Sequence, residues 1–262
     1  MSLTERQIAG LAEEAAAATA AARQSMSNAV GVADELDGLL RRCENEVDEF
    51  SHQGRLAANA EYPMRHALNA RGIAEDIDGR LRSALRGLDE LDGELDRAAR
   101  ALDAAGRAQY QLGEAPGRDP RATGSALSRV EGLAGVVQQA KESAEGARRR
   151  IGLTRQDLRA RVDQAPNPER DRAAAELEAA GQSARDDVEY LRGRFQGARD
   201  GLDSAVPVAN QAGYESAELA TAMRAAANPT PAADRIAPAA SSETDLRRRL
   251  DGPAADRDLD RS

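Results

Sequence analysis

Few side chains in this chain of 262 residues could do chemistry, and Glu49 with His52 is the most suggestive pair. A Glu-x-x-His spacing on a helix is half of a di-iron site in a helical bundle, which needs a second such pair and two further glutamates. The only other histidine, His66, has no glutamate three residues before it. Glu49 and His52 also fall outside the inward positions of the helix pattern described below. We therefore expect no metal site and no cofactor.

A reactive nucleophile is not indicated either. Cys43 is the only cysteine, and His52 lies roughly 13 Å further along the same predicted helix, too far for a nucleophile and its base. Cys43 occupies an inward position, where it packs as a small apolar side chain. The alternative is a disulfide between copies at a symmetric dimer interface. Phosphate loops, dinucleotide fingerprints and nucleophile elbows are missing from the sequence, so we expect a protein that is not an enzyme.

The composition predicts an all-α fold. Aromatic residues make up only 2% of the chain and Trp is absent. Alanine and leucine must therefore do most of the packing, and alanine in particular favours helices over strands. Nearly all basic residues are arginine, with Lys141 the only lysine. This excess of arginine and alanine is typical of GC-rich genomes such as those of actinobacteria.

The net charge and the hydropathy of the chain indicate which classes of partner and which cellular location to expect. A net charge of -9 and a pI near 5.0 oppose binding to nucleic acid or to anionic membranes, because both attract basic residues. No apolar run approaches the ~18 residues of a transmembrane helix. The N-terminus lacks the apolar stretch of a cleavable signal peptide. We expect a cytoplasmic protein, and export without a cleavable signal peptide is the alternative.

Clusters of proline divide the chain into four long helices, predicted at 4–58, 63–112, 124–164 and 168–227. Short connections suit antiparallel neighbours. We therefore expect a first helical hairpin over 1–112, a linker over 113–123, a second hairpin over 124–227 with a kink near Pro207, and a disordered tail over 228–262. The hairpins form either one elongated bundle or two units stacked end to end.

Each predicted helix carries apolar residues with a heptad spacing, which is typical of coiled-coil-like packing. The second helix is the most regular, and only Gln109 interrupts its inward positions, which are Ala67, Ala70, Ala74, Ile77, Leu81, Ala84, Leu88, Leu91, Leu95, Ala98, Leu102, Ala105 and Leu112. In the first helix one series is Ile8, Ala15, Ala22, Ala29, Leu36, Cys43 and Phe50, and the other is Leu11, Ala18, Ser25, Val32 and Leu39. The first helix is expected to lose this pattern at Glu46. The third and fourth helices continue the spacing over 130–158 and 177–223.

Many glycines lie inside these helices, and each weakens a helix by about 1 kcal/mol relative to alanine. Alanine also buries little apolar area, so we expect a marginally stable monomer or a homo-oligomer. Gly193, Gly197 and Gly201 follow one another at four-residue intervals. Such a series is typical of close approach by another helix, which makes these glycines candidate partner contacts.

Charged residues form two patterns. The third helix is net positive whereas the other three are net negative. Its basic run at 147–162 is expected to form a solvated or interhelical salt-bridge face, with a nucleic-acid patch as the alternative. A short phrase also recurs, as VADELDGLL at 32–40, IAEDIDGRL at 73–81 and LDELDGEL at 88–95. We interpret it as a packing phrase, with a shared ligand site as the alternative.

The residues Tyr214-Glu215-Ser216-Ala217-Glu218 match the pattern Y-x-x-x-[DE] near the C-terminal end, and Tyr110 through Glu114 has the same spacing. In this motif and in its acidic, alanine-rich helices the chain resembles actinobacterial type VII secretion substrates. The resemblance covers the last third of the chain and implies that Tyr214 and Glu218 are a secretion signal. The family's W-x-G turn is absent because the chain has no Trp, and Phe195-Gln196-Gly197 falls in the middle of a predicted helix.

Within the tail, SSETDLRRRLDGP predicts a short helix over 243–251 that begins after a capping Ser242. Leu246 and Leu250 lie one turn apart there and are candidate contacts for a protein partner. The leading hypothesis is a non-enzymatic structural or adaptor coiled-coil protein that acts through contacts with other proteins or with itself. A type VII secretion-associated substrate or partner is the alternative.

Overall fold

The computed structural model describes residues 4–59, 63–115, 120–164 and 170–228. Within these ranges the chain forms four long α-helices: α1 (Glu5–Asn59), α2 (Pro63–Gly113), α3 (Pro120–Gln164) and α4 (Arg170–Ala227). The all-α fold predicted from composition and proline placement is therefore confirmed. α3 begins four residues earlier than predicted, with Pro120 at its first position, where a missing backbone N–H removes no helical hydrogen bond.

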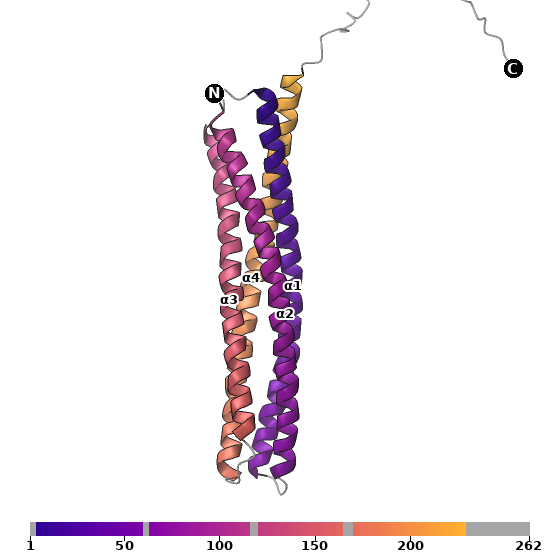
Figure 1. The fold of residues 1–262 in the computed structure, drawn as a ribbon, viewed down its shortest axis with the longest axis vertical. Helices are drawn as coiled ribbons and strands as arrows, with labels where there is room; N and C mark the ends of the chain where they lie inside the picture. The colour runs from indigo at the N-terminus through magenta and orange to yellow at the C-terminus, as the bar shows by residue number, and fades with distance from the viewer. Residues whose placement is uncertain (1–3, 60–62, 116–119, 165–169, 229–262) are drawn as a thin grey trace, which may run out of the picture.

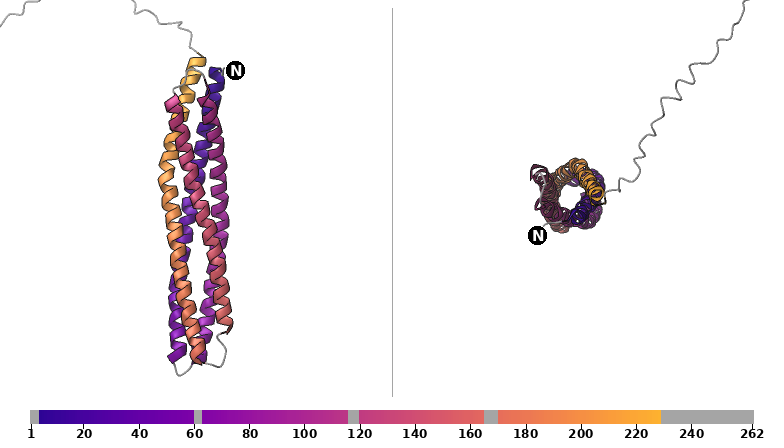
Figure 2. Two further views of the ribbon diagram at one scale, coloured as in Figure 1. Left: turned by 90° about the vertical axis from the view of Figure 1, so that its left-hand side faces the viewer. Right: turned by 90° about the horizontal axis from the view of Figure 1, so that it is seen from above.

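The helices lie side by side in one elongated bundle and alternate in direction (Figures 1 and 2). α1 packs against α2 and α4, and α3 packs against the same two helices from the opposite corner. The two hairpins therefore pack against each other along their length and are not stacked end to end. The backbone of α3 approaches its neighbours closely at fewer positions than that of α1, which leaves more space along α3.

The buried core follows the predicted heptads in three helices. Every inward position of α2 from Ala70 to Leu112 is buried, and only Ala67 at the start of the series is half-buried. The series at 130–158 in α3 is buried, as is that at 177–209 in α4. Leu219 and Met223 at the end of α4 are half-buried. The spacing of apolar residues thus identified the inward faces of α2, α3 and α4.

The inward face of α1 differs from the prediction in one of its two series. Leu11, Val32 and Leu39 are only half-buried, and the residue after each predicted position turns inward instead: Ala12, Thr19, Met26, Ala33 and Leu40 are buried. The predicted loss of the pattern at Glu46 is also wrong, because Val47 and Phe50 are fully buried and continue the seam. Both series are apolar enough to face inward, and packing against two neighbours selects the second.

A buried polar layer divides the interior near the end of the bundle where α4 finishes. Gln109, the one predicted interruption of the α2 stripe, donates a hydrogen bond to Ser216 Oγ at 2.9 Å. Thr19 is buried beside this level and donates to its own helix at Ala15 O. On one side lies the main apolar core, and on the other a small cluster formed by Ile8, Leu11, Ala12, Leu112, Ala115, Leu219, Ala220 and Met223.

α1 and α4 approach each other closely at Gly181. A Cβ added there would collide with Ser51 Oγ and would lie 3.2 Å from Ser51 Cα, so a larger residue requires Ser51 or its helix to shift. Gly79 and Gly93, by contrast, have nothing within 4 Å of an added Cβ. α4 continues through Pro207 without ending, and the kink expected there stays a prediction. The predicted helix at 243–251, with Leu246 and Leu250, lies outside the described residues.

Candidate protein-contact surfaces

The residues with the most suggestive spacing for catalysis lie on the outside of α1. Glu49 and His52 are both exposed, and Glu49 Oε1 accepts a hydrogen bond from Gln53 Nε2 at 2.8 Å. Gln53 Oε1 in turn lies 2.9 Å from His66 Nδ1 on α2. These polar contacts join the two helices of the first hairpin. Among the described residues, no group of three or more His, Cys, Asp or Glu side chains is placed to hold a metal ion.

Cys43 is fully buried between α1 and α2. Burial, together with the charge of Glu46, raises the pKa of its thiol to about 12, and Arg80 opposes them only in part. The thiol therefore stays protonated at neutral pH and packs as an apolar side chain, as predicted. The alternative of a disulfide at a dimer interface is not compatible with this position, because Cys43 faces the core of its own bundle.

Basic residues of α3 form a regular series of ion pairs with α2. Lys141, Arg148 and Arg155 lie seven residues apart, so they repeat on one face of the helix. Lys141 Nζ lies 2.5 Å from Asp96, Arg148 Nη1 lies 2.6 Å from Asp89, and Arg155 Nε lies 2.7 Å from Asp78. We call this series the α3 ladder. The predicted interhelical salt-bridge role of the basic third helix is thereby confirmed.

A second series joins α4 to α1 with the same seven-residue spacing. Its basic members are Arg185, Arg192 and Arg199, which pair with Asp48, with Asp37 and Glu44, and with Asp34. Both series run from the second hairpin to the first. They fix the alignment of the two hairpins along both seams, because a shift of one helix by one turn would break several pairs at once.

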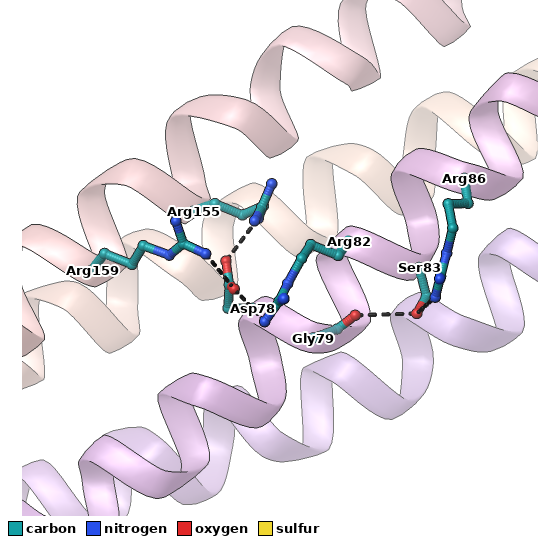
Figure 3. A network of polar contacts seen from close by, with 7 residues as sticks. All are labelled: Asp78, Gly79, Arg82, Ser83, Arg86, Arg155 and Arg159. Carbon is teal, nitrogen blue, oxygen red and sulfur yellow. Dashed lines mark hydrogen bonds and ion pairs between the residues drawn. The ribbon is translucent and has the colours of Figure 1, made fainter.

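The recurring sequence phrase supplies acidic partners for these ladders. The aspartates that precede its glycine are Asp37, Asp78 and Asp92, and each pairs with an arginine from a helix of the other hairpin. Asp78 is the most enclosed, with a side chain only 6% exposed. Its carboxylate receives Arg155 and Arg159 of α3 at 2.7 Å each and Arg82 of its own helix at 2.9 Å (Figure 3). The phrase therefore serves packing, as predicted.

Electrostatics at Asp78 favour the charged carboxylate. Burial alone raises the pKa of Asp78, but hydrogen bonds from Arg155 and Arg159, together with their positive charges, outweigh it. The net result is a pKa below the ordinary value of an aspartate. Asp78 therefore stays ionised at neutral pH and holds α2 and α3 together through its ion pairs.

A groove with a volume of about 600 Å³ lies between α2 and α3. Its floor consists of the core residues Leu102, Val130 and Val137, and small residues of both helices leave it open. We call it the α2–α3 groove. Its small wall residues are Ala99, Gly106 and Ala134, Tyr110 and Leu127 add apolar surface, and its polar rim is Asp103, Arg107, Gln111, Glu131 and Gln138.

The α2–α3 groove was not predicted from the sequence, although the sequence contains a signal for it. The small residues Ala99, Gly106 and Ala134 occupy the position that follows the core stripe on facing helices. Two helices that both carry small side chains there leave unfilled space between them. Tyr110, on the same stretch of α2, is 60% exposed although it is one of only six aromatic residues. An exposed aromatic beside an apolar groove is typical of a contact surface.

The glycine series of α4 does not mark a close helix contact within the chain. An added Cβ would meet nothing within 4 Å at Gly193 or Gly197, and at Gly201 it would make only ordinary contact with Val136. Gly197 and Gly201 instead line a groove of about 320 Å³ between α3 and α4, together with Arg194. Their predicted contact with a partner therefore stays a prediction.

The tyrosine and glutamate of the secretion-like motif lie on the surface of α4. Tyr214 is 63% exposed and Glu218, one turn further, is also exposed. Tyr214 borders a groove of about 380 Å³ between α1 and α4. Glu215, between them, instead pairs with Arg129 of α3 at 2.6 Å. Phe195 is buried in the core of a continuous helix, so it cannot replace the tryptophan of a W-x-G turn.

None of the described helices combines the length and the apolar character needed to cross a membrane. No protein-family model, curated protein or solved structure that was compared with the chain matches it. Its function therefore has to be inferred from the surfaces described above.

Proposed function

We propose that the protein is a non-enzymatic helical adaptor that binds other proteins, or itself, along its long helices. The α2–α3 groove is the observation that carries this proposal. It offers an apolar floor on a surface that is otherwise rich in charged side chains. A groove with an apolar floor between two helices is a common binding site for an amphipathic helix of a partner.

The dimensions of the α2–α3 groove fit a helical segment. Its lining on α2 runs from Ala99 to Gln111, which corresponds to about 18 Å along the helix axis. Apolar side chains one turn apart on a partner helix would reach the floor at Leu102 and Val130, since small wall residues let that helix approach. The acidic and basic rim residues would surround such contacts, as polar rims do in protein interfaces.

The ladders support a scaffold rather than an enzyme. Their charged side chains pair with one another and hold the helices together. Among the described residues, the cysteine and the histidines form no reactive pair. α1 has 55 residues and is therefore about 80 Å long. This length exceeds the diameter of a compact domain with the same number of residues as the whole chain. A long rod with a groove near one end is suited to connecting partners.

Photo-crosslinking from the groove tests this function. Tyr110 is replaced by p-benzoylphenylalanine in the full chain, and Tyr190 of α4 receives the same replacement as a control because it is an exposed tyrosine outside the groove. We expect a discrete covalent adduct from position 110 only, and its loss when Ala134→Arg fills the groove. Equal adducts from both positions, or an adduct that Ala134→Arg leaves unchanged, would contradict the proposal. An adduct of twice the chain mass identifies self-association.

A second function, export by a type VII secretion system, is supported by the joint exposure of Tyr214 and Glu218. The test compares culture supernatant with cell lysate for the intact chain and for Tyr214→Ala. Tyr110→Ala is the matched control, because Tyr110 and Glu114 have the same spacing and are also exposed. Export that Tyr214→Ala abolishes and Tyr110→Ala preserves supports this function. Absence of the intact chain from the supernatant contradicts it.

A further inference from the structure

We infer that a surface formed jointly by α1 and α4 binds a second copy of the same chain. The surface comprises residues 15–33 of α1 and 204–214 of α4, and we call it the uncharged face. It lies opposite the α2–α3 groove, because α1 packs between α2 and α4, and α3 packs between the same two helices, in the ring seen from above in Figure 2. The inference goes beyond the proposed function, since it concerns a different surface.

Charged residues are nearly absent from both helices at this level of the bundle. The only charged residue in 15–33 is Arg23, and 204–214 contains none, although 31% of the chain is charged. The two stretches lie side by side, because a Cβ added at Gly213 would be 3.9 Å from Thr19 Cγ2. Depletion of charge distinguishes the core of a protein interface from the rest of a protein surface.

The ion pairs between α1 and α4 stop at the two ends of the uncharged face. Arg199 Nε lies 3.0 Å from Asp34 Oδ1 at one end, and Arg224 Nη2 lies 2.6 Å from Glu13 Oε1 at the other. Between these pairs, the next position in the seven-residue arginine series of α4 is Val206. The groove of about 380 Å³ between α1 and α4 lies in this interval, and most of its lining residues are alanine or glycine. Small side chains of this kind let another helix approach closely.

Arg23 and Tyr214 make the uncharged face complementary to itself. Arg23 is half-buried in the groove and has no ion-pair or hydrogen-bond partner among the described residues. Tyr214 is 63% exposed and lines the same groove, one turn from Asn210. In a symmetric pair with α1 of each copy against α4 of the other, each Arg23 faces Asn210 and Tyr214 of the other copy. A guanidinium stacks favourably on an aromatic ring, and the two-fold symmetry forms this contact twice.

The net charge of -9 favours this face over the others for contact between two copies. Two copies repel each other wherever their acidic surfaces meet. The α2–α3 groove, the groove between α3 and α4, and a further groove of about 290 Å³ between α2 and α3 all have acidic lining residues, which are Asp103, Glu131, Glu142, Glu75, Asp78 and Asp163. Of the four grooves, the one between α1 and α4 has no acidic lining residue. Carboxylates resume at the borders of the uncharged face, at Glu14 and Asp203.

The area of the uncharged face is sufficient for a reversible dimer. Asp34 and Glu13 lie 21 positions apart in α1, or about 31 Å. Two helices of about 10 Å diameter with axes about 8–10 Å apart are about 19 Å wide. Each copy therefore contributes about 600 Å², and a pair buries about 1,200 Å², which is the lower end of the range for specific protein interfaces.

Sedimentation equilibrium of the full chain from about 1 to about 200 µM tests the inference. We expect the average mass to rise from one chain toward two. Ala20→Glu places a charge on the uncharged face, and Ala179→Glu is the matched control, because Ala179 is also an exposed alanine but lies on α4 outside that face. Ala20→Glu should raise the dissociation constant at least about tenfold, and Ala179→Glu should change it less than about twofold. Circular dichroism checks that both variants keep the helical content of the wild-type chain.

A mixing experiment keeps the test decisive if a variant is less stable. Asn210→Arg should also prevent self-association, because in the symmetric pair it would face Arg23 of the other copy. An equimolar mixture of Ala20→Glu and Asn210→Arg should dimerise again, since the new glutamate and the new arginine then face each other between the two chains. A mixture of Ala179→Glu and Asn210→Arg should form no mixed dimer.

Several results would overturn the inference. One is a wild-type chain that stays monomeric at every concentration, even if the uncharged face binds a different protein. Others are a dimer that Ala20→Glu leaves intact, equal weakening by Ala20→Glu and Ala179→Glu, or a mixture of Ala20→Glu and Asn210→Arg that stays monomeric.

The photo-crosslinker at position 110 separates this inference from the proposed function. The expected dimer without an adduct from position 110 would support the inference and contradict the adaptor function of the α2–α3 groove. An adduct of twice the chain mass that Ala134→Arg removes and Ala20→Glu leaves unchanged would place self-association in that groove, which overturns the inference and supports the adaptor function. If both hold, the dimer carries its two α2–α3 grooves on opposite outer sides, and a partner with two binding segments gains avidity from binding both.

Discussion

Asp78→Asn is the most direct test of the ion pairs that hold α3. The substitution keeps the size of the side chain and removes its charge, so Arg155 and Arg159 lose a carboxylate 2.7 Å away. A hydrogen bond that involves a charged group contributes about 1.5–3 kcal/mol when its partner is removed. Arg82 and Arg159 are 58% exposed and can recover water, whereas Arg155 is only 19% exposed. Asp78→Asn should therefore lower the free energy of unfolding by about the contribution of one such hydrogen bond, about 2 kcal/mol.

The assay is thermal unfolding followed by circular dichroism at 222 nm. A loss of about 2 kcal/mol corresponds to a fall in Tm of about 4–8 °C for a domain of this size. Asp103→Asn is the matched control, because the Asp103–Arg107 pair is exposed on both sides and should contribute less than about 0.5 kcal/mol. If Asp78→Asn lowers Tm no more than Asp103→Asn does, the ion pairs of Asp78 do not hold α3 to α2.

The pH dependence gives a second, independent check. The pKa of Asp78 in the folded chain lies below its ordinary value of 3.8, so the folded state binds a proton at this site less readily than the unfolded state. Its stabilisation is present above about pH 4 and is lost as the pH falls through the folded-state pKa. The difference in Tm between the wild-type chain and Asp78→Asn should therefore be largest near neutral pH and shrink in acid. A difference that stays constant down to about pH 2 would refute the charge argument.

The remaining predictions concern packing. Gly181→Ala should lower the free energy of unfolding, measured by urea titration, by about 1–2 kcal/mol, because its Cβ would collide with Ser51. Gly93→Ala should raise this free energy by about 1 kcal/mol, since nothing lies within 4 Å of an added Cβ. Changes of the same sign in the two variants would contradict the described packing of the helices. Leu91→Ala should cost about 2–5 kcal/mol in the same titrations because Leu91 is fully buried, and a loss below about 1 kcal/mol would mean that the site is not enclosed. Cys43 should resist an aromatic disulfide reagent in the folded chain at pH 8 and react fully in guanidinium chloride, because burial raises its pKa to about 12; rapid reaction when folded would show that the thiol is accessible.

The heptad spacing predicted the fold where only one set of apolar positions exists. In α2 the residues on either side of Leu81, Leu88 and Leu95 are polar, charged or glycine, so one face alone can turn inward. In α1 the pairs Leu11–Ala12 and Leu39–Leu40 are apolar at both positions, and the sequence of one helix does not choose between them. The choice depends on two neighbouring helices, since a bundle helix buries a wider stripe than a two-stranded coiled coil does.

The contact surfaces were harder to predict because they depend on the space between helices. The basic character of α3 indicated salt bridges, but the pairing of Arg148 with Asp89 and Asp92 follows from the relative heights of two hairpins. The α2–α3 groove depends on small side chains of two helices meeting at one level. Ala99 and Ala134 are unremarkable alone in a chain so rich in alanine, and they leave a groove only because they face each other.

The layer formed by Gln109 and Ser216 also separates two regions of different local stability. Beyond it, the small apolar cluster draws on α1, α2 and α4, and no described residue of α3 contributes to it. Segments with little buried apolar area open at a small fraction of the global free energy. Amide hydrogens near Ile8 and Ala220 should therefore exchange with solvent well before those near Leu91, and opening should stop at the polar layer. The α2–α3 groove borders this end, so a bound helix would slow exchange there while leaving the rest of the bundle unchanged.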